Sequence, residues 1–138
     1  MGVWKRSIAV VLSLILSTVF ILTFQAGSIG IDPYWANLTS LDVGLSFSSG
    51  KGTISGVVIG NTGTTQITAN AVLECLNSNG TYTRVASWNN YSVSGDLLVI
   101  SETCYVTRGY TYRLTITTTV YKNGVGETVS GSHSAYAD

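Results

Sequence analysis

Two cysteines are the residues of this chain whose chemistry is easiest to define. Cys75 and Cys104 are its only cysteines, and the N-terminal sequence described below indicates export. An even pair of cysteines in an exported chain predicts a disulfide, and closing this loop corresponds to about 3–4 kcal/mol of stabilisation. The alternative is two buried thiols that pack as small apolar side chains. Two cysteines with one distant histidine are a poor ligand set, so we expect no metal site and no cofactor.

The single histidine and the carboxylates do not suggest a catalytic centre. His133 lies in the terminal stretch 131–134, where we expect a frayed chain end and an exposed imidazole. A Ser-His-Asp triad would require it beside Asp138 or Glu127. Carboxylates that could pair for glycoside hydrolysis stand beside no aromatic cluster in the sequence; they are Asp42, Glu74, Asp96, Glu102 and Glu127. We therefore expect no catalytic residues and a protein that is not an enzyme.

Aromatic side chains are the remaining candidates for binding. A flat group of them could stack against sugar rings, and the chain offers Tyr34, Trp35, Trp88, Tyr91, Tyr105, Tyr110 and Tyr121. The alternative is that Trp88 and Tyr112 belong to the core, while Tyr34 and Trp35 cap one end of the fold. We take four of them as ligand-binding candidates: Tyr34, Trp35, Tyr91 and Tyr121.

A row of threonines accompanies the clearest strand pattern. Thr115, Thr117 and Thr119 face away from Leu114 and Ile116. A regular threonine array can match ice or a repetitive polysaccharide. One strand is too little for that purpose, so we expect the row to be a solvated face of a sheet.

These residues must be positioned by strands, because apolar and polar residues alternate almost everywhere after Ser40. The alternation predicts seven strands, at 42–48, 53–60, 67–75, 82–88, 97–103, 110–121 and 125–134. Turn residues separate them every ~8–12 residues, and Asn123-Gly124 is the strongest hairpin signal. We predict an all-β fold after an N-terminal signal helix. It is an antiparallel seven-stranded β-sandwich of the immunoglobulin or fibronectin type, over residues 40–138.

Local details sharpen this prediction. Tyr110 and Tyr112 follow Gly109, where a tyrosine hydroxyl can fold back on the preceding loop as a tyrosine corner. Gly56, inside the second strand, indicates a bulge or a close approach. Trp88 is expected to be the central aromatic residue of the core. In an immunoglobulin-like order the third and sixth strands share one sheet, and the fifth lies in the other.

The N-terminal residues indicate the compartment. In residues 1–28, Lys5 and Arg6 precede a long apolar run, and Ala26-Gly27-Ser28 follows it. This order is that of a secretory signal peptide, which is removed on export. The alternative is an uncleaved membrane anchor over residues 7–24, because the run is close to the ~20 residues that span a bilayer. We expect residues 29–39 to be an extended lead-in and the domain to be extracellular, either secreted or membrane-anchored.

Composition argues against some partners. Seven Lys/Arg residues balance seven Asp/Glu residues, and removing Lys5 and Arg6 leaves five against seven, a net charge near −2. The remaining basic residues are scattered along the chain. This distribution argues against nucleic acid, and against membrane association unless the N-terminal segment is uncleaved.

Several short motifs together carry a resemblance to a known family. They are Pro33-Tyr34-Trp35, the stretch 45–51, Ser87-Trp88, Tyr112-Arg113-Leu114 and the stretch 120–124. In this combination the chain resembles a family of small exported Firmicutes proteins, chiefly clostridial, that carry one domain of unknown function. The resemblance implies export and a lone β domain, and it implies no activity. Cys75 and Cys104 depart from the family pattern, which leaves their role open.

The sequence therefore favours an exported, non-catalytic β-sandwich that acts as an extracellular interaction or structural module. One alternative is a small carbohydrate-binding domain, which exposed aromatic residues at one end would favour. Another is a secreted, bacteriocin-like antagonistic protein. The expected partner is a cell-envelope glycan or another extracellular protein.

Overall fold

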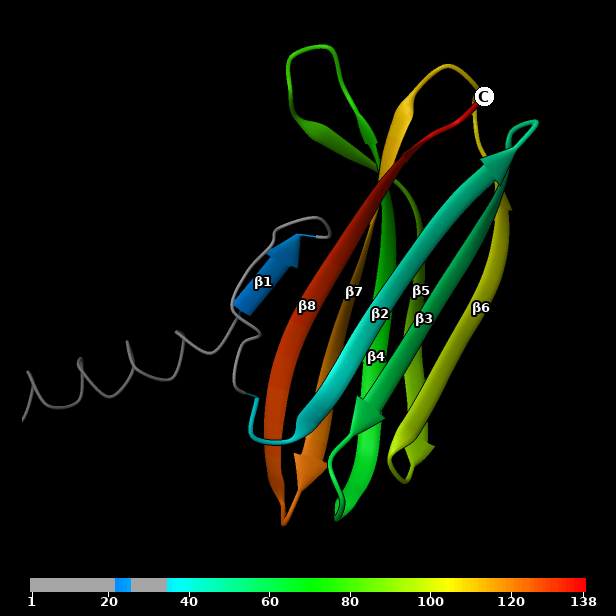
Figure 1. The fold of residues 1–138 in the computed structure, drawn as a ribbon. Coiled ribbons are helices and arrows are strands. Elements are labelled where there is room, and N and C mark those ends of the chain that lie inside the picture. The colour runs from blue at the N-terminus through cyan, green and yellow to red at the C-terminus, as the bar shows by residue number, and fades with distance from the viewer. Residues whose placement is uncertain (1–21, 26–34) are drawn as a thin grey trace, which may run out of the picture.

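A computed structural model describes residues 22–25 and 35–138 of the chain. The described residues form eight strands, coloured along the chain in Figure 1. They are β1 (Leu22–Gln25), β2 (Leu38–Ser48), β3 (Lys51–Gly60), β4 (Thr64–Leu76), β5 (Tyr82–Ser94), β6 (Leu97–Tyr105), β7 (Thr111–Lys122) and β8 (Val125–Tyr136). The seven strands β2–β8 correspond one to one with the seven predicted from the alternation.

The strands form two packed sheets. One sheet has the order β1-β8-β7-β4-β5 and the other has the order β2-β3-β6. Strands β2–β8 pair only antiparallel with one another. Figure 1 shows the two sheets as separate layers. The predicted antiparallel seven-stranded sandwich is confirmed, including the placement of β4 and β7 in one sheet and of β6 in the other.

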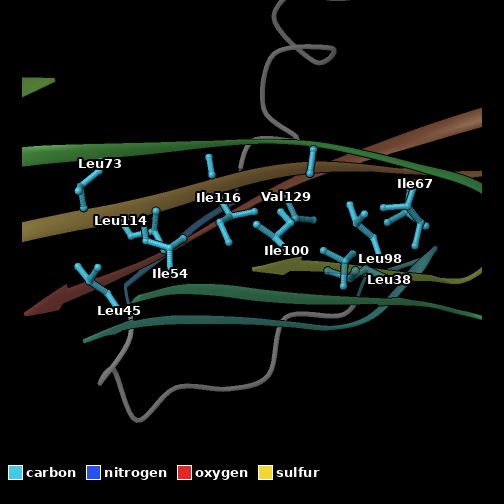
Figure 2. Close-up of a cluster of buried hydrophobic side chains, with 14 of the residues drawn as sticks. Leu38, Leu45, Ile54, Ile67, Leu73, Leu98, Ile100, Leu114, Ile116 and Val129 are labelled. Carbon is cyan, nitrogen blue, oxygen red and sulfur yellow. The ribbon is translucent and has the colours of Figure 1, made fainter. Parts of the chain in front are cut away.

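The core forms because alternate side chains of each strand point to one face. In β3 the residues Ile54 and Val58 are buried, and Leu114 and Ile116 of β7 are fully buried. Figure 2 shows such side chains meeting between the sheets. Burying each large aliphatic side chain contributes about 1.5–3 kcal/mol, so this layer holds the two sheets together.

Tight turns join the strands where the sequence indicates them. Asn123 and Gly124 have φ values of 53° and 75°, the left-handed pair that a two-residue hairpin needs. Ser49 and Gly50 do the same between β2 and β3, with φ values of 51° and 78°. The predicted hairpin of the last two strands is therefore confirmed, and its register runs without a shift from Thr111↔Tyr136 to Lys122↔Val125.

Gly56 marks a close approach between the sheets. A Cβ atom at this position would lie only 2.5 Å from Ile116 Cδ1. The strand β3 pairs without interruption with β2 at Val43 and with β6 at Ile100, so there is no bulge here. Of the two predicted explanations for this glycine, the close approach is the one observed.

Trp88 differs from its predicted role. Its side chain is half-buried and packs against the margin of the core, whose centre is filled by aliphatic residues. The reason is that β5 is an edge strand, so inward side chains such as Trp88 are covered by β4 on one side only. The prediction of a central aromatic residue was wrong in this respect.

The expectations for the N-terminus fall mostly outside the described residues. Residues 1–21 of the expected signal lie outside the described residues. The segment 26–34, which contains the expected cleavage positions and Tyr34, also lies outside them. Leu22–Gln25, expected within a signal helix, is instead the short strand β1, parallel to Val129–Ser132 of β8. Pairing there supplies hydrogen-bond partners to the edge of β8. Among residues 22–25 and 35–138 there is no helix long and apolar enough to cross a membrane.

Candidate functional site

The outward face of the β8-β7-β4-β5 sheet carries a row of charged residues across three strands. Glu74 of β4 lies opposite Arg84 of β5 and opposite Arg113 of β7. The Arg113 Nη2 atom is 3.1 Å from Glu74 Oε1. The Arg113 guanidinium also lies 3.6 Å from the centre of the Tyr82 ring. Arg113 is therefore held in place twice, by a carboxylate and by an aromatic face.

Next to this row, β7 and β8 present two facing columns of hydroxyl groups. The oxygen atoms of Thr115 and Ser132 are 2.9 Å apart, and those of Thr117 and Ser130 are 2.8 Å apart. Thr119 and Thr128 form a third pair at 2.8 Å. The threonine row predicted on one strand is thus one half of a two-strand array. The sequence missed the second column because the pairing depends on the β7–β8 register.

A bulge at Asn90 in the edge strand β5 changes the local shape of this face. Asn90 has a φ of 65°, and the β4–β5 register shifts between Ala69 and Ala71. The Asn90 backbone N–H donates to Asn70 Oδ1 over 3.0 Å. Because this contact uses the amide oxygen of Asn70, its two N–H donors remain available on the outward face.

Two neighbouring shallow depressions lie on this face. The larger has a volume of about 530 Å³, and its lining includes Asn70, Val72, Glu74, Arg84, Asn89 and Arg113. The smaller has a volume of about 340 Å³, and its lining includes Thr68, Asn70, Asn90, Ser92 and Thr119. Asn70 and Thr117 line both depressions, so they form one continuous polar surface. Its groups are guanidinium, carboxylate, amide and hydroxyl.

The structure describes three of the four aromatic ligand-binding candidates, Trp35, Tyr91 and Tyr121, and of these Tyr91 lines the smaller depression. Trp35 and Tyr91 are half-buried and pack against the core. Tyr121 alternates with the buried Val120 and so faces outward, where its ring covers Gly126 of β8. The Tyr91 hydroxyl donates to Glu102 Oε1 over 2.6 Å. Burial, and then Glu102, raises the pKa of Tyr91 to about 12.

The two cysteines are free thiols, so the predicted Cys75–Cys104 disulfide is wrong. Cys75 lies on β4 opposite Tyr112, and Cys104 lies on β6, in the other sheet, opposite Gly52. A disulfide needs the two Cα atoms within about 7 Å, and Cys75 and Cys104 do not approach to bonding distance. Both side chains pack against the core, and burial raises the pKa of the Cys104 thiol. This is the buried-thiol alternative.

The predicted tyrosine corner is present at Tyr112. The side chain is buried, and its hydroxyl donates to the backbone oxygen of Thr107 over 2.8 Å. Its ring centre is 5.3 Å from that of Phe47. Tyr110, the other tyrosine considered for this role, is half-exposed.

The remaining titratable candidates have structural partners. Glu127 accepts hydrogen bonds from the backbone N–H groups of Ala36, Asn37 and Leu38 at 2.7–3.1 Å. It thereby fixes the entry to β2. His133 is not in a frayed end, because it pairs with Leu114 inside β8 and is half-buried. Within the described part of the chain, His, Cys, Asp and Glu form no group of three or more that could hold a metal ion.

Comparisons with known proteins give distant structural similarities, of which two follow. No protein-family model matches the sequence, and no curated protein matches it either. The fold is similar to the solution structure of CsgH from R. palustris, with a TM-score of 0.40 and 12% identity over 65% of this chain and 87% of CsgH. It is also similar to Spo0M, a sporulation control protein from Bacillus subtilis, with a TM-score of 0.39 and 12% identity. That alignment covers 70% of this chain and 47% of Spo0M.

Proposed function

We propose that the protein is an exported, non-catalytic interaction module that binds its partner through the outward face of the β8-β7-β4-β5 sheet. The observation that carries this proposal is the continuous polar surface formed by the two depressions, with Asn70 and Thr117 shared between them. Strands place these groups on a rigid frame, so their positions are set before a partner arrives.

A non-catalytic role is supported by how the carboxylates are used. Glu74 pairs with Arg113, Glu102 accepts from Tyr91, and Glu127 accepts from backbone N–H groups. Each of these three carboxylates holds a structural contact. A catalytic pair of acids would instead face a common space where a substrate bond could lie.

A carbohydrate ligand is the more specific candidate, and the composition of the surface favours it. Sugars are bound through many hydroxyl groups, and here the amides of Asn70 and Asn89 and the hydroxyl of Thr117 face one shallow depression. Of the predicted platform of Tyr34, Trp35, Tyr91 and Tyr121, this surface contains Tyr91, which lines the smaller depression, but neither Trp35 nor Tyr121. A cell-envelope glycan is the partner we propose.

The other outward face offers an apolar alternative. Val57 and Ile59 of β3 lie opposite Val99 and Leu97 of β6, and all except Val57 are exposed. A patch of this kind would suit another extracellular protein rather than a glycan. A test of the proposal must therefore separate the two faces.

Sedimentation with insoluble cell-envelope material separates them. The isolated protein should pellet with the envelope. Replacing Thr117 by Trp should block the polar surface and leave the protein in the supernatant. The matched control is Thr53→Trp, because Thr53 faces outward from β3 on the opposite sheet. Equal pelleting of both variants would contradict the proposal. Failure of the parent protein to pellet with the envelope would contradict it too. Equal melting temperatures would show that both variants are folded.

Export is tested separately by the mature N-terminus. We expect a product beginning between Ile29 and Ile31 in the culture fluid. Finding only the full-length chain in the membrane fraction would favour the anchor over the cleaved signal.

A further inference from the structure

We infer that the larger depression binds a sugar residue carrying a carboxylate group, so that the glycan recognised by this module is acidic. This inference rests on the proposed function and specifies its ligand. It begins from the row Arg84–Glu74–Arg113, in which one acidic residue lies opposite an arginine on each of the two neighbouring strands.

The charges in this row do not balance. Glu74 is paired with Arg113, whose guanidinium is also stacked on Tyr82. Arg84 is exposed and forms no ion pair with any residue that the structure describes. The depression therefore has one uncompensated positive charge, on a chain whose net charge is zero or negative. An anionic ligand meets local attraction here without help from the rest of the molecule.

Arginine selects the shape of the anion as well as its charge. A guanidinium presents parallel N–H donors that match two oxygens of a carboxylate, and also two oxygens of a phosphate, so a phosphate polymer is included in the test below. Arg84 lies at the rim of the depression, on the edge strand β5, so a ligand can reach it without displacing Glu74 from Arg113.

The rest of the lining suits a sugar ring beside that carboxylate. Asn70 keeps two N–H donors because its oxygen is used by Asn90. Thr115 and Ser132 share one hydrogen bond; Ser132 is buried, and the half-buried Thr115 keeps hydroxyl capacity for a ligand hydroxyl. Val72 supplies an apolar spot for the C–H groups of a ring. A volume of about 530 Å³ lies within the ~300–1,000 Å³ typical of small-molecule sites.

Two polymers with the same sugar backbone, one with free carboxylates and one with methyl esters, test the inference. The probes are polygalacturonate and its methyl-esterified form, which has the same backbone without the carboxylate charge. Binding of the isolated protein to each is measured by affinity electrophoresis or titration calorimetry. We expect binding to polygalacturonate and binding about tenfold or more weaker to the ester, because a hydrogen bond to a charged group is worth about twice a neutral one.

Variants locate the effect. Arg84→Gln should weaken binding to polygalacturonate about tenfold or more and leave the weak binding to the ester unchanged. The matched control is Arg108→Gln, an exposed arginine in the loop before β7 that does not line the depression. It should bind polygalacturonate as the parent protein does.

Three outcomes would overturn the inference: equal binding of acid and ester, equal losses in the two arginine variants, or binding to poly(glycerol phosphate) in place of polygalacturonate. If these occur while envelope pelleting still depends on Thr117, the acidic ligand is wrong and the proposed function stands. If pelleting by the parent protein also fails, both are wrong.

Discussion

Tyr112 shows how single side chains hold this sandwich together. Its hydroxyl ties the start of β7 to the backbone of Thr107, and its ring packs beside Phe47 of β2 in the opposite sheet. Glu127 of β8 acts in a similar way at the start of β2, where its carboxylate accepts hydrogen bonds from the backbone N–H groups of Asn37 and Leu38. Such contacts fix the residue at which a strand begins. The alternation of residues alone predicts that residue only to within one or two positions.

Removing the Tyr112 hydroxyl should lower the stability of the fold. In Tyr112→Phe the ring stays in place and the Thr107 carbonyl loses its donor, so we expect a loss of about 1 kcal/mol in urea denaturation. The matched control is Tyr110→Phe, because the Tyr110 side chain is half-exposed. A loss of the same size in both variants would show that the hydrogen bond from Tyr112 to Thr107 does not stabilise the fold more than an exposed tyrosine hydroxyl does.

Tyr91 should make stability fall at high pH. Its pKa is about 12 in the folded protein and 10.0 without the fold, so the folded state keeps the proton that the unfolded state releases. Its contribution is complete below about pH 10 and is lost as pH rises toward about 12. Urea midpoints of the parent protein and of Tyr91→Phe should therefore converge between about pH 9 and about pH 11.5. A constant difference across this range would contradict the assignment.

At the scale of the elements, the sequence predicts the strands well and the site poorly. Alternation requires only local information, and it places all seven strands. It ends β5 too early, at Trp88, because the bulge at Asn90 interrupts the period of two. The row through Arg84 and Glu74 depends on the β4–β5 register, which shifts twice, and no sequence pattern encodes those shifts. The predicted disulfide was wrong for a similar reason, since it depends on the distance between sheets.

Gly56 provides a test of how the two sheets pack. In Gly56→Ala the new methyl group would meet Ile116 Cδ1, and overpacking of this kind costs about 1–3 kcal/mol. Ile116→Val removes that Cδ1 atom and costs about 0.5–1.5 kcal/mol by itself. We expect the double variant to be more stable than the sum of the two losses predicts, as measured by urea denaturation. Strictly additive losses would show that the two positions do not touch.

At the scale of the whole molecule, the two outward faces have different chemistry. The β8-β7-β4-β5 face is hollowed and polar, with charged, amide and hydroxyl groups in one surface. The β2-β3-β6 face carries the exposed apolar side chains Ile59, Leu97 and Val99. The proposed function assigns the partner to the polar face and leaves the apolar one free. This division is the central claim, because the ligand class follows from it.

Mapping the bound surface by NMR tests this claim most directly. The measurement is a titration of the ¹⁵N-labelled protein with soluble cell-envelope polysaccharide, followed through backbone amide signals. We expect the shifts to cluster at Asn70, Arg84 and Thr117 and the signals of Ile59, Leu97 and Val99 to stay in place. Shifts confined to the apolar face, or no shifts at all, would contradict the account.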